Sequence, residues 1–508
     1  MAKYLGLDLS TQSLSALIVD GDNGQILVDE SINFGRDLPG YNAPNGFVKG
    51  PNEGEVFSSP LMWLDAADKL FAKLQESTDL SSIRGIAGSG QQHATVYLNS
   101  RFKEAIGNLN TSSSLSENLK STLSRDHSPI WMDNSTSGEC GEIADAADGK
   151  DNVLKISGSI PIERFSGAQI RKFYKTDSAA YANTDAIHLA SSFFCSVMSG
   201  SNAPIDFGDG AGMNLLNLAD NNWDPTLLEA CAPGLSSKLP DAKASNSYVS
   251  TINSYFVEKY GFSADTEVYV FSGDNPNSLI GCGGALPGTA VISLGTSDTF
   301  FAAMSNPVTD PNGFGHVFGN PAGGYMSLIC FMNGSLTREK LKDHFNLGWD
   351  EFSEAISSEA DSIELPWLID EITPKVPACV SSITALNTSQ NPKDIRKFVE
   401  GQFVNMLANS EWMGETINHI ILTGGASQND ALAQVIADVF NAKIERLEVT
   451  NSAALGAAMR AFQSSTGKSW QDVNSLFIKT DKSKSISPGS FQLAKKLEEY
   501  RTLVTKNS

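Results

Sequence analysis

The segment YLGLDLSTQSLSALIVD, residues 4 to 20, decides the fold. Its two apolar runs, YLGLDLS and LSALIVD, are joined by the short polar turn TQS, and this pattern predicts two antiparallel strands. A third run of strand type, QILVDES (residues 25 to 31), follows the turn signal GDNG. The chain therefore opens with three consecutive strands that form a meander.

A related pattern returns at residues 289 to 304, where TAVISLG, TSD and TFFAAM again place a polar turn between two apolar runs. Thr11 and Thr296 occupy matching positions in the two turns. Hairpins with Ser or Thr turns are common, but the repeat suggests two lobes of one ancestry. Between the hairpins the pattern predicts a helix at residues 59 to 75 and a strand at residues 83 to 90, and this alternation indicates α/β architecture.

The chain of 508 residues is too long for a single hydrophobic core. A domain boundary fits best in the polar stretch DAKASNSY (residues 241 to 248), which predicts one domain over residues 1 to 245 and another over residues 246 to 508. The closing segment SFQLAKKLEEYRTLVTK is amphipathic, and we expect it to form a helix that packs back on the body of the protein.

The charge balance excludes one class of partner. With 58 acidic and 37 basic side chains, the formal charge is −21, which repels a polyphosphate backbone. We therefore expect no nucleic-acid partner. A small anion such as a nucleotide remains compatible with this charge, because backbone amides and a divalent cation can hold phosphates locally.

Cysteine spacing and hydropathy indicate a cytoplasmic protein without a membrane partner. No uninterrupted apolar stretch of about 18 residues occurs, and the first residues contain no signal-peptide core. The cysteines lie far apart, without the spacing of a zinc or redox site, which predicts reduced thiols. They are Cys140, Cys195, Cys231, Cys282, Cys330 and Cys379.

The turn after the first strand is a candidate phosphate site. In GLDLSTQS, residues 6 to 13, the strand brings Asp8 to a turn where its carboxylate could hold Mg²⁺ through water. The hydroxyl groups and amides that could wrap phosphate oxygens belong to Ser10, Thr11, Gln12 and Ser13. An ordinary hairpin turn favours the same residue types, so the segment alone leaves both interpretations open.

Two segments offer groups that suit the hydroxyls of a polyol. GSGQQHATVY (residues 88 to 97) combines glycines with Gln91, Gln92 and His93, whose amide and imidazole groups can bind hydroxyls. ERFSGAQIRKFY (residues 163 to 174) contains Arg164, whose guanidinium could donate two hydrogen bonds to adjacent oxygens. A structural histidine and a surface salt bridge are the plainer alternatives. Three further basic residues are most simply a solvated helix face: Arg171, Lys172 and Lys175.

The segment VYVFSGDNPNSL, residues 268 to 279, is a candidate for the reacting centre. Its apolar run predicts a buried strand that ends sharply at Asp274, Asn275 and Pro276. Ligands of open α/β sheets bind at the carboxyl ends of strands, where a carboxylate can accept the proton of a hydroxyl. An Asx-turn before the proline is the structural alternative.

A last candidate is ILTGGASQNDALAQVIADVF, residues 421 to 440. It predicts a strand, a Gly-Gly turn and a helix that begins near Ser427. Without Cβ atoms in the turn, a flat base or ribose can lie against the backbone, with Asn429 reaching it from the first helical turn. The chain contains neither GxGxxG nor a Walker motif, so Rossmann and P-loop nucleotide sites lose support.

Taken in order, these segments resemble the FGGY carbohydrate kinases of the actin and hexokinase fold group, and within them the eukaryotic-type xylulose kinases. The resemblance extends over essentially the whole chain. It is carried by DLSTQS (8 to 13), GSGQQH (88 to 93), PIWMDNST (129 to 136), ERFSGAQI (163 to 170), PIDFGDGAGMNLL (204 to 216), GDNP (273 to 276), SLGTSDT (293 to 299), NGSLTREK (333 to 340), LTGGASQN (422 to 429) and NSAALGAA (451 to 458). Many members carry a basic residue after the Trp-x-Asp motif, whereas this chain has Asn134, Ser135 and Thr136.

The resemblance implies two ribonuclease-H-like domains that flank a catalytic cleft. It implies that Asp274 is the general base, and that the ketopentose contacts His93, Arg164, Asp274 and Asn275. It places Asp8 near Mg²⁺. The residues that it implies around ATP are Thr11, Gln12, Ser13, Gly295, Thr296, Trp349, Gly424, Gly425 and Asn429.

The expected activity is phosphorylation of D-xylulose to D-xylulose 5-phosphate, with ATP and Mg²⁺ in the cleft and a place in xylose metabolism. A kinase for D-ribulose or another polyol, and a non-catalytic sugar-responsive protein of the same fold, remain as alternatives. The sequence leaves open whether the chain is a monomer or a homodimer.

Overall fold

The computed structural model describes residues 2–447, 451–480 and 482–507. Its backbone contacts divide the chain into two compact units. The first unit comprises Met1–Gly281, Phe318–Gly324 and Asn451–Ile478. The second unit comprises Cys282–Val317, Tyr325–Thr450 and Lys479–Ser508.

The first unit is built on a seven-stranded sheet with the order β14-β15-β6-β1-β2-β3, and β16 also pairs with β6. The strands are β1 (Lys3–Leu9), β2 (Ser13–Asp20), β3 (Ile26–Asn33), β6 (Ile83–Gly90), β14 (Tyr248–Thr251), β15 (Glu267–Tyr269) and β16 (Ser272–Gly273). β1 is antiparallel to β2 and parallel to β6. The predicted three-strand opening and the predicted strand at 83 to 90 are confirmed.

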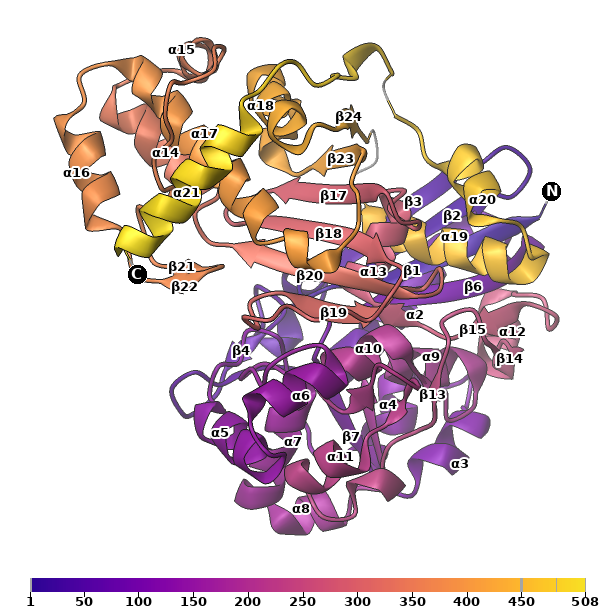
Figure 1. The fold of residues 1–508 in the computed structure, drawn as a ribbon. Coiled ribbons are helices and arrows are strands. Elements are labelled where there is room, and N and C mark those ends of the chain that lie inside the picture. Colours follow the sequence, from indigo (N-terminus) through magenta and orange to yellow (C-terminus); the bar gives the residue numbers. More distant parts are fainter. Residues whose placement is uncertain (1, 448–450, 481, 508) are drawn as a thin grey trace. The chain divides into compact units, whose positions relative to one another are not determined.

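The second unit repeats this order. Its six-stranded sheet runs β19-β20-β18-β17-β23-β24, so that β20-β18-β17-β23-β24 corresponds to β3-β2-β1-β6-β15 (Figure 1). The strands are β17 (Thr289–Leu294), β18 (Asp298–Met304), β19 (His316–Gly319), β20 (Tyr325–Phe331), β23 (His419–Thr423) and β24 (Lys443–Arg446). The last two residues of β19 are grouped with the first unit. As in the first unit, the central strand is antiparallel to one neighbour and parallel to the other. The predicted repeat of a ribonuclease-H-like α/β core is confirmed.

The helices divide between the two units. Those of the first unit are α1 (Phe34–Asp37), α2 (Pro60–Ser77), α3 (Phe102–Gly107), α4 (Leu115–Leu119), α5 (Ser137–Ala146), α6 (Lys150–Ser157), α7 (Ser166–Thr176), α8 (Ser178–Ala182), α9 (Ala190–Ser199), α10 (Phe207–Gly212), α11 (Pro225–Cys231), α12 (Ser254–Tyr260), α13 (Asp274–Gly281), α19 (Ser452–Thr466) and α20 (Trp470–Phe477). Those of the second unit are α14 (Ser335–His344), α15 (Trp349–Ala355), α16 (Val380–Thr388), α17 (Ile395–Ala408), α18 (Asp430–Phe440) and α21 (Leu493–Asn507).

Short strands form separate small ladders. In the first unit β4 (Val48–Lys49), β5 (Val56–Ser58) and β8 (Ser128–Pro129) make one, and β7 (Thr95–Leu98) pairs with β9 (Ala186–Leu189). β10 (Ile205–Asp206) pairs with β13 (Ala242–Lys243), and β11 (Leu216–Asn217) with β12 (Asn222–Trp223). In the second unit β21 (Glu371–Ile372) pairs with β22 (Lys375–Val376).

Small residues bring α19 close to the first sheet and to α13. A Cβ atom on Gly6 of β1 would lie 1.9 Å from the carbonyl oxygen of Ala454, and one on Gly456 would lie 1.9 Å from that of Asn277. Larger side chains at these positions would separate the elements. Because α13 starts at Asp274, this packing fixes the helix whose first residues are the candidate reacting centre.

The compact units divide between Gly281 and Cys282, later than the predicted boundary between residues 245 and 246. The polar stretch at 241 to 248 is a connection inside the first unit, since β14 and β15 follow it and β15 pairs with β6. The chain later returns to the first unit with α19 and α20. Polarity marks exposed loops, whereas only strand pairing reveals to which unit the next strand belongs.

The amphipathic segment at the end of the chain forms α21, which packs on α17 in the second unit. Lys496 of α21 is fully buried, and its Nζ lies 2.9 Å from Oε2 of Glu400. Glu400 also accepts a hydrogen bond of 2.6 Å from Arg396. This buried carboxylate with two cations attaches the helix to the unit.

Across the described parts of the chain, no helix combines the length and apolar character needed to cross a bilayer. All six cysteines are free thiols.

Candidate active site

The carboxyl ends of three strands meet in the first unit. In the ladder between β1 and β6, Asp8 lies opposite Ser89, and in the ladder between β16 and β6, Gly273 lies opposite Gly90. Asp274 is therefore the first residue beyond β16, at the same edge of the sheet as Asp8. The sequence segments that were predicted to carry a carboxylate, an amide cluster and a phosphate turn come together here.

Backbone and side-chain amides hold the carboxylate of Asp274. Its Oδ1 accepts hydrogen bonds from the backbone N–H of Asn275 at 2.9 Å and from the Asn275 carboxamide at 3.2 Å, with the N–H of Gln92 at 3.4 Å. Burial, followed by the negative charge of Asp8, raises the pKa of Asp274 to about 7. A carboxylate with such a pKa is suited to take a proton near neutral pH.

Asp8 is 5 % exposed, and its Oδ2 accepts a hydrogen bond from the hydroxyl of Ser10. Its other oxygen, Oδ1, is buried, and no hydrogen-bonding partner for it occurs among the described residues. Burial raises the pKa of Asp8. Such an oxygen is costly unless a ligand completes its coordination.

The turn between β1 and β2 is more closely tied to its surroundings than the sequence predicts. Thr11 accepts a hydrogen bond of 2.9 Å from the indole N–H of Trp131 and lies 3.4 Å from the carboxamide oxygen of Gln91. Gln12 is exposed and Ser13 is half-buried at the start of β2. Trp131 belongs to the PIWMDNST motif, but the motif itself contains no signal that its indole reaches this turn.

His93 and Arg164 both contact Phe165. The His93 ring lies 4.5 Å from the Phe165 ring between centroids, and the Arg164 guanidinium lies 5.8 Å from the centroid of the same ring. Nδ1 of His93 is 3.0 Å from the carbonyl oxygen of Gly212, and His93 adopts a left-handed backbone with φ of 70°. Phe165 thus brings two predicted sugar-binding residues, which lie far apart in sequence, to one place.

The three basic residues of α7 differ from the expected solvated face. Lys172 is mostly buried and donates hydrogen bonds of 2.6 Å to Glu55 and 2.8 Å to Ser135. Arg171 bonds to Glu142 and to a backbone carbonyl, while Lys175 bonds to Glu142 and to a second glutamate. All three form ion pairs. The pair of Lys172 is mostly buried, whereas Lys175 stays exposed. The helical pattern placed them on one face but did not reveal their acidic partners.

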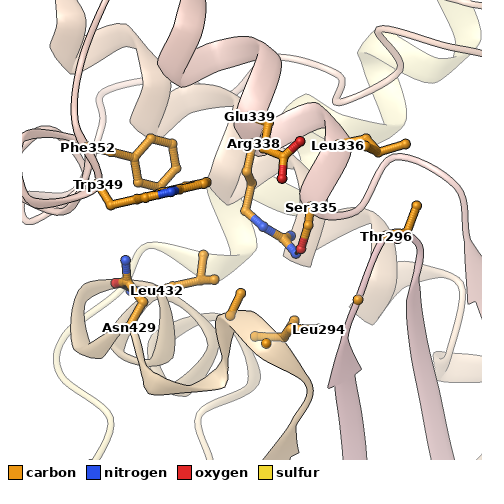
Figure 2. Close-up of a pocket in the computed structure, with 13 residues that line it drawn as sticks. Leu294, Thr296, Ser335, Leu336, Arg338, Glu339, Trp349, Phe352, Asn429 and Leu432 are labelled. Carbon is orange, nitrogen blue, oxygen red and sulfur yellow. Dashed lines mark hydrogen bonds between the residues drawn. The ribbon is translucent and has the colours of Figure 1, made fainter.

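The second unit contains a cavity of about 560 Å³. Its lining residues are Leu294, Gly295, Thr296, Ser335, Leu336, Arg338, Glu339, Trp349, Phe352, Gly425, Ala426, Asn429 and Leu432. Figure 2 shows Trp349 and Thr296 on opposite sides of it, with Arg338 and Ser335 between them. Trp349 is 48 % exposed and packs edge-to-face on Phe352 at 5.4 Å between ring centroids. An exposed aromatic face beside a glycine turn suits a flat, partly polar ligand.

The two glycines of the Gly-Gly turn have different surroundings. Gly424 has φ of 86°, and a Cβ atom there would lie 2.5 Å from the carbonyl oxygen of Leu294, so this glycine allows β23 to turn against β17. Gly425 lines the cavity, and a Cβ atom there would meet no atom within 4 Å. Only the second glycine therefore leaves room for a ligand, whereas the sequence interpretation gave both residues that role.

Asn429 precedes the helix that was expected to begin near Ser427. It is the N-cap of α18, which starts at Asp430, and its side-chain oxygen accepts a hydrogen bond of 2.9 Å from the N–H of Leu432. Its Nδ2 donates to Ser353 at 2.8 Å. Asn429 thus lines the cavity while both ends of its carboxamide are held by the protein.

The solved structure of xylulose kinase from Rhodospirillum rubrum has the same fold, with a TM-score of 0.81, 17 % identity and coverage of 99 % of this chain and 98 % of that one. Xylulose kinase from Rattus norvegicus is 38 % identical over 477 residues, 91 % of this chain and 88 % of the relative. Xylulose kinase from Mus musculus is also 38 % identical, over 91 % of this chain and 86 % of the relative.

Family models match both halves of the chain. The N-terminal domain of the FGGY family of carbohydrate kinases matches residues 120–281, and the C-terminal domain of the same family matches residues 290–465. The matched regions contain the two candidate sites apart from the first hairpin and the segment at residues 88 to 93, and they meet near the division between the compact units. The chain belongs to the FGGY family of carbohydrate kinases.

Proposed function

We propose that this chain transfers the γ-phosphoryl group of ATP to D-xylulose and forms D-xylulose 5-phosphate. The substrate is inferred from the relatives named xylulose kinase, which match about nine-tenths of the chain. The observation that supports general-base catalysis is the carboxylate of Asp274, which accepts hydrogen bonds from amides and has a pKa raised to about 7.

In this mechanism Asp274 accepts the proton of the attacking sugar hydroxyl. Phosphoryl transfer passes through a loose transition state, so the enzyme contributes chiefly by positioning and by stabilising charge. A positioned base adds roughly 10²- to 10⁴-fold in rate. We assign Asn275, His93 and Arg164 to the other hydroxyls of the sugar, because amide, imidazole and guanidinium groups can pair with them.

We assign the nucleotide to the cavity of the second unit. Trp349 offers a face for the adenine base, Gly425 gives the ribose access to the backbone, and Asn429 borders the same space. Gly295 and Thr296 follow β17 and line the same cavity, where backbone amides are suited to phosphate oxygens. Thr296 lies on the side opposite Trp349 (Figure 2). In the first unit Thr11, Gln12 and Ser13 form the matching turn, which we assign to the phosphate that is transferred.

A Mg²⁺ ion fits the donor set at Asp8. The buried Oδ1 of Asp8 has no partner among the described residues, and Mg²⁺ is commonly bound by one or two carboxylates together with phosphate oxygens and water. The described residues contain no group of three or more potential ligands, so an all-protein metal cage is not proposed. When bound, the ion would neutralise phosphate charge during transfer.

The deciding experiment is an ADP-release assay across D-xylulose, D-ribulose, other ketopentoses, pentitols and glycerol. We expect the highest kcat/KM with D-xylulose. Asp274→Asn should lower kcat by roughly 10²- to 10⁴-fold while the protein stays folded and binds sugar. The exposed Asp265 provides a matched control, and Asp265→Asn should retain full activity.

Three outcomes would contradict the proposal. A preference for D-ribulose or a polyol would overturn the substrate, and full activity of Asp274→Asn would overturn the base. Absence of ADP release with every sugar, from folded protein that binds sugar, would indicate a sugar-responsive protein without turnover.

We also propose a cytoplasmic location and a role in xylose metabolism. The support for the location is that all six cysteines are free, which is usual for proteins in a reducing compartment. Fractionation of cells that express the chain would test it, and recovery from an oxidising compartment would contradict it.

A further inference from the structure

Gln92 contacts both residues at the start of α13. Its backbone N–H lies 3.4 Å from Oδ1 of Asp274, and its side-chain Oε1 accepts a hydrogen bond of 2.8 Å from Nδ2 of Asn275. The Asn275 carboxamide in turn donates to Oδ1 of Asp274 at 3.2 Å. A closed set of contacts therefore joins the end of β6 to the first two residues of α13.

The direction of the Gln92 carboxamide is decided by these contacts. Asn275 uses its Nδ2 as the donor, so the atom of Gln92 that faces it must be the acceptor Oε1. Nε2 of Gln92 then faces away from Asn275, and this buried nitrogen has no hydrogen-bonding partner among the described residues. Rotating the carboxamide by half a turn would oppose two donors and break the link to Asn275.

Gly273 leaves the room that this arrangement requires. A Cβ atom at Gly273 would lie 2.6 Å from Cγ and 3.0 Å from Nε2 of Gln92, and 2.6 Å from Oδ1 of Asp209. Gln92 is only 4 % exposed, so its side chain has no solvent-facing alternative. The side chain is thus confined between the end of β16 and α10, in the conformation that bonds Asn275.

We propose that Gln92 is a positioning residue for phosphoryl transfer, which holds Asp274 and Asn275 in one fixed arrangement. This inference rests on the proposed function, since it gives Gln92 a role through the base and the sugar-binding amide. Small errors in the placement of a reacting group lower the rate more than they lower binding. Loss of the Gln92 side chain should therefore act mainly on kcat.

The first test is Gln92→Met, which keeps the length of the side chain and removes its hydrogen bond. We expect kcat for D-xylulose to fall about 10- to 100-fold and KM to change less than about 3-fold. Gln92→Glu keeps an acceptor for Asn275 but adds a carboxyl group beside Asp274, which raises the pKa of that residue further. The two variants are therefore compared at pH 9, where Asp274 is ionised, and Gln92→Glu should recover there at least about 10-fold of the lost kcat. Gln75→Met, at an exposed position of α2, is the control for the same exchange and should be fully active.

A double-mutant cycle separates positioning from general destabilisation. If Gln92 acts through Asn275, the effect of Gln92→Met on kcat should shrink at least about 5-fold in an Asn275→Ala background. Three results would each overturn the inference: additive effects, an unchanged kcat in folded Gln92→Met, or a Gln92→Glu variant that is as slow as the Met variant at pH 9. If Gln92→Met does not fold, Gln92→Glu provides the test, and a loss of kcat above about 100-fold at pH 9 in that folded variant counts against the proposal.

Failure of this inference can be told apart from failure of the proposed function. Full activity of Asp274→Asn would remove the base, whatever Gln92 does. An inactive Asp274→Asn together with a fully active Gln92→Met would leave the base in place and remove only the positioning role.

Discussion

The two sheets have the same strand order, yet their corresponding turns carry different chemistry. In the first unit Asp8 and Asp274 lie at the strand ends without a cation beside them among the described residues, and burial raises the pKa of both. In the second unit Asp298, at the start of β18, forms an ion pair of 2.7 Å with the buried Arg338. Burial raises the pKa of Asp298 too, but Arg338 acts against that shift. The two units therefore differ in whether a cation lies beside the buried carboxylate.

The largest expected effect concerns the paired carboxylate. Arg338→Met would leave Asp298 buried without its cation, and we expect the second unit to lose roughly 3–5 kcal/mol of unfolding free energy. The double variant Arg338→Met with Asp298→Leu removes both charges and should recover most of that loss. Urea unfolding of the single and the double variant would measure the loss of unfolding free energy and its recovery.

If the Arg338→Met protein were as stable as the parent, the proposed difference between the units would be contradicted, because Asp298 would then tolerate burial without a cation as Asp8 and Asp274 do. Asp274→Asn serves as the counterpart in the first unit. It removes an unpaired buried charge, so it should leave the unfolding free energy unchanged or raise it.

The next effect is the pH dependence of the unpaired carboxylates. As the proposed base, Asp274 acts only when ionised. Its pKa is raised to about 7, so kcat/KM should fall about tenfold per pH unit below that value. The charge of Asp8 helps to raise the pKa of Asp274. The charge of Asp274 in turn helps to raise the pKa of the buried Asp209. Measurement of kcat/KM for D-xylulose from pH 5 to 9 at saturating MgATP would reveal this acidic decline.

A bound Mg²⁺ at Asp8 would lower the pKa of Asp274, and the decline of kcat/KM would then begin at a lower pH. The pH at which kcat/KM begins to fall should therefore decrease as the concentration of free Mg²⁺ is raised. A flat profile from pH 5 to 9 would show that Asp274 is ionised throughout and would remove the distinction between the units.

A smaller effect is expected at the cavity of the second unit. Trp349→Ala removes an exposed aromatic face and should raise the KM for ATP about 3- to 10-fold, which corresponds to the roughly 0.5–1.5 kcal/mol of an aromatic contact. The KM for D-xylulose should stay the same, and Trp349→Phe should restore most of the ATP affinity. A change in the sugar KM instead would contradict the assignment of the nucleotide to this cavity.

The architecture could be predicted because its signals are local. Strand-turn-strand patterns at residues 4 to 20 and 289 to 304 predicted both hairpins, and the end of an apolar strand predicted where Asp274 would lie. Contacts between distant residues carry no such signal. The Gln92–Asn275 bond joins positions 183 apart, and the Trp131–Thr11 bond joins positions 120 apart.

Local pattern was also insufficient where one residue type serves two purposes. Gly424 and Gly425 look alike in sequence, but one faces the backbone of Leu294 and the other faces the cavity. Asn429 was expected inside a helix and instead caps it. The assignments of substrate, nucleotide and metal to particular residues stay predictions that the experiments above test.

The smallest expected effect compares the two threonines that mark the repeat. Thr11 receives a hydrogen bond from Trp131 and lies near Gln91, whereas Thr296 is exposed and borders the cavity. Thr11→Val should therefore cost roughly 0.5–1.5 kcal/mol of unfolding free energy, and Thr296→Val should cost almost nothing. Denaturant titration of both variants tests this directly. Equal losses would mean that Thr296 is bonded as firmly as Thr11, and the second turn would then be as closely tied to its unit as the first. Unequal losses in the expected direction would show that corresponding positions of the repeat have diverged, one toward holding its neighbours and the other toward remaining open to a ligand.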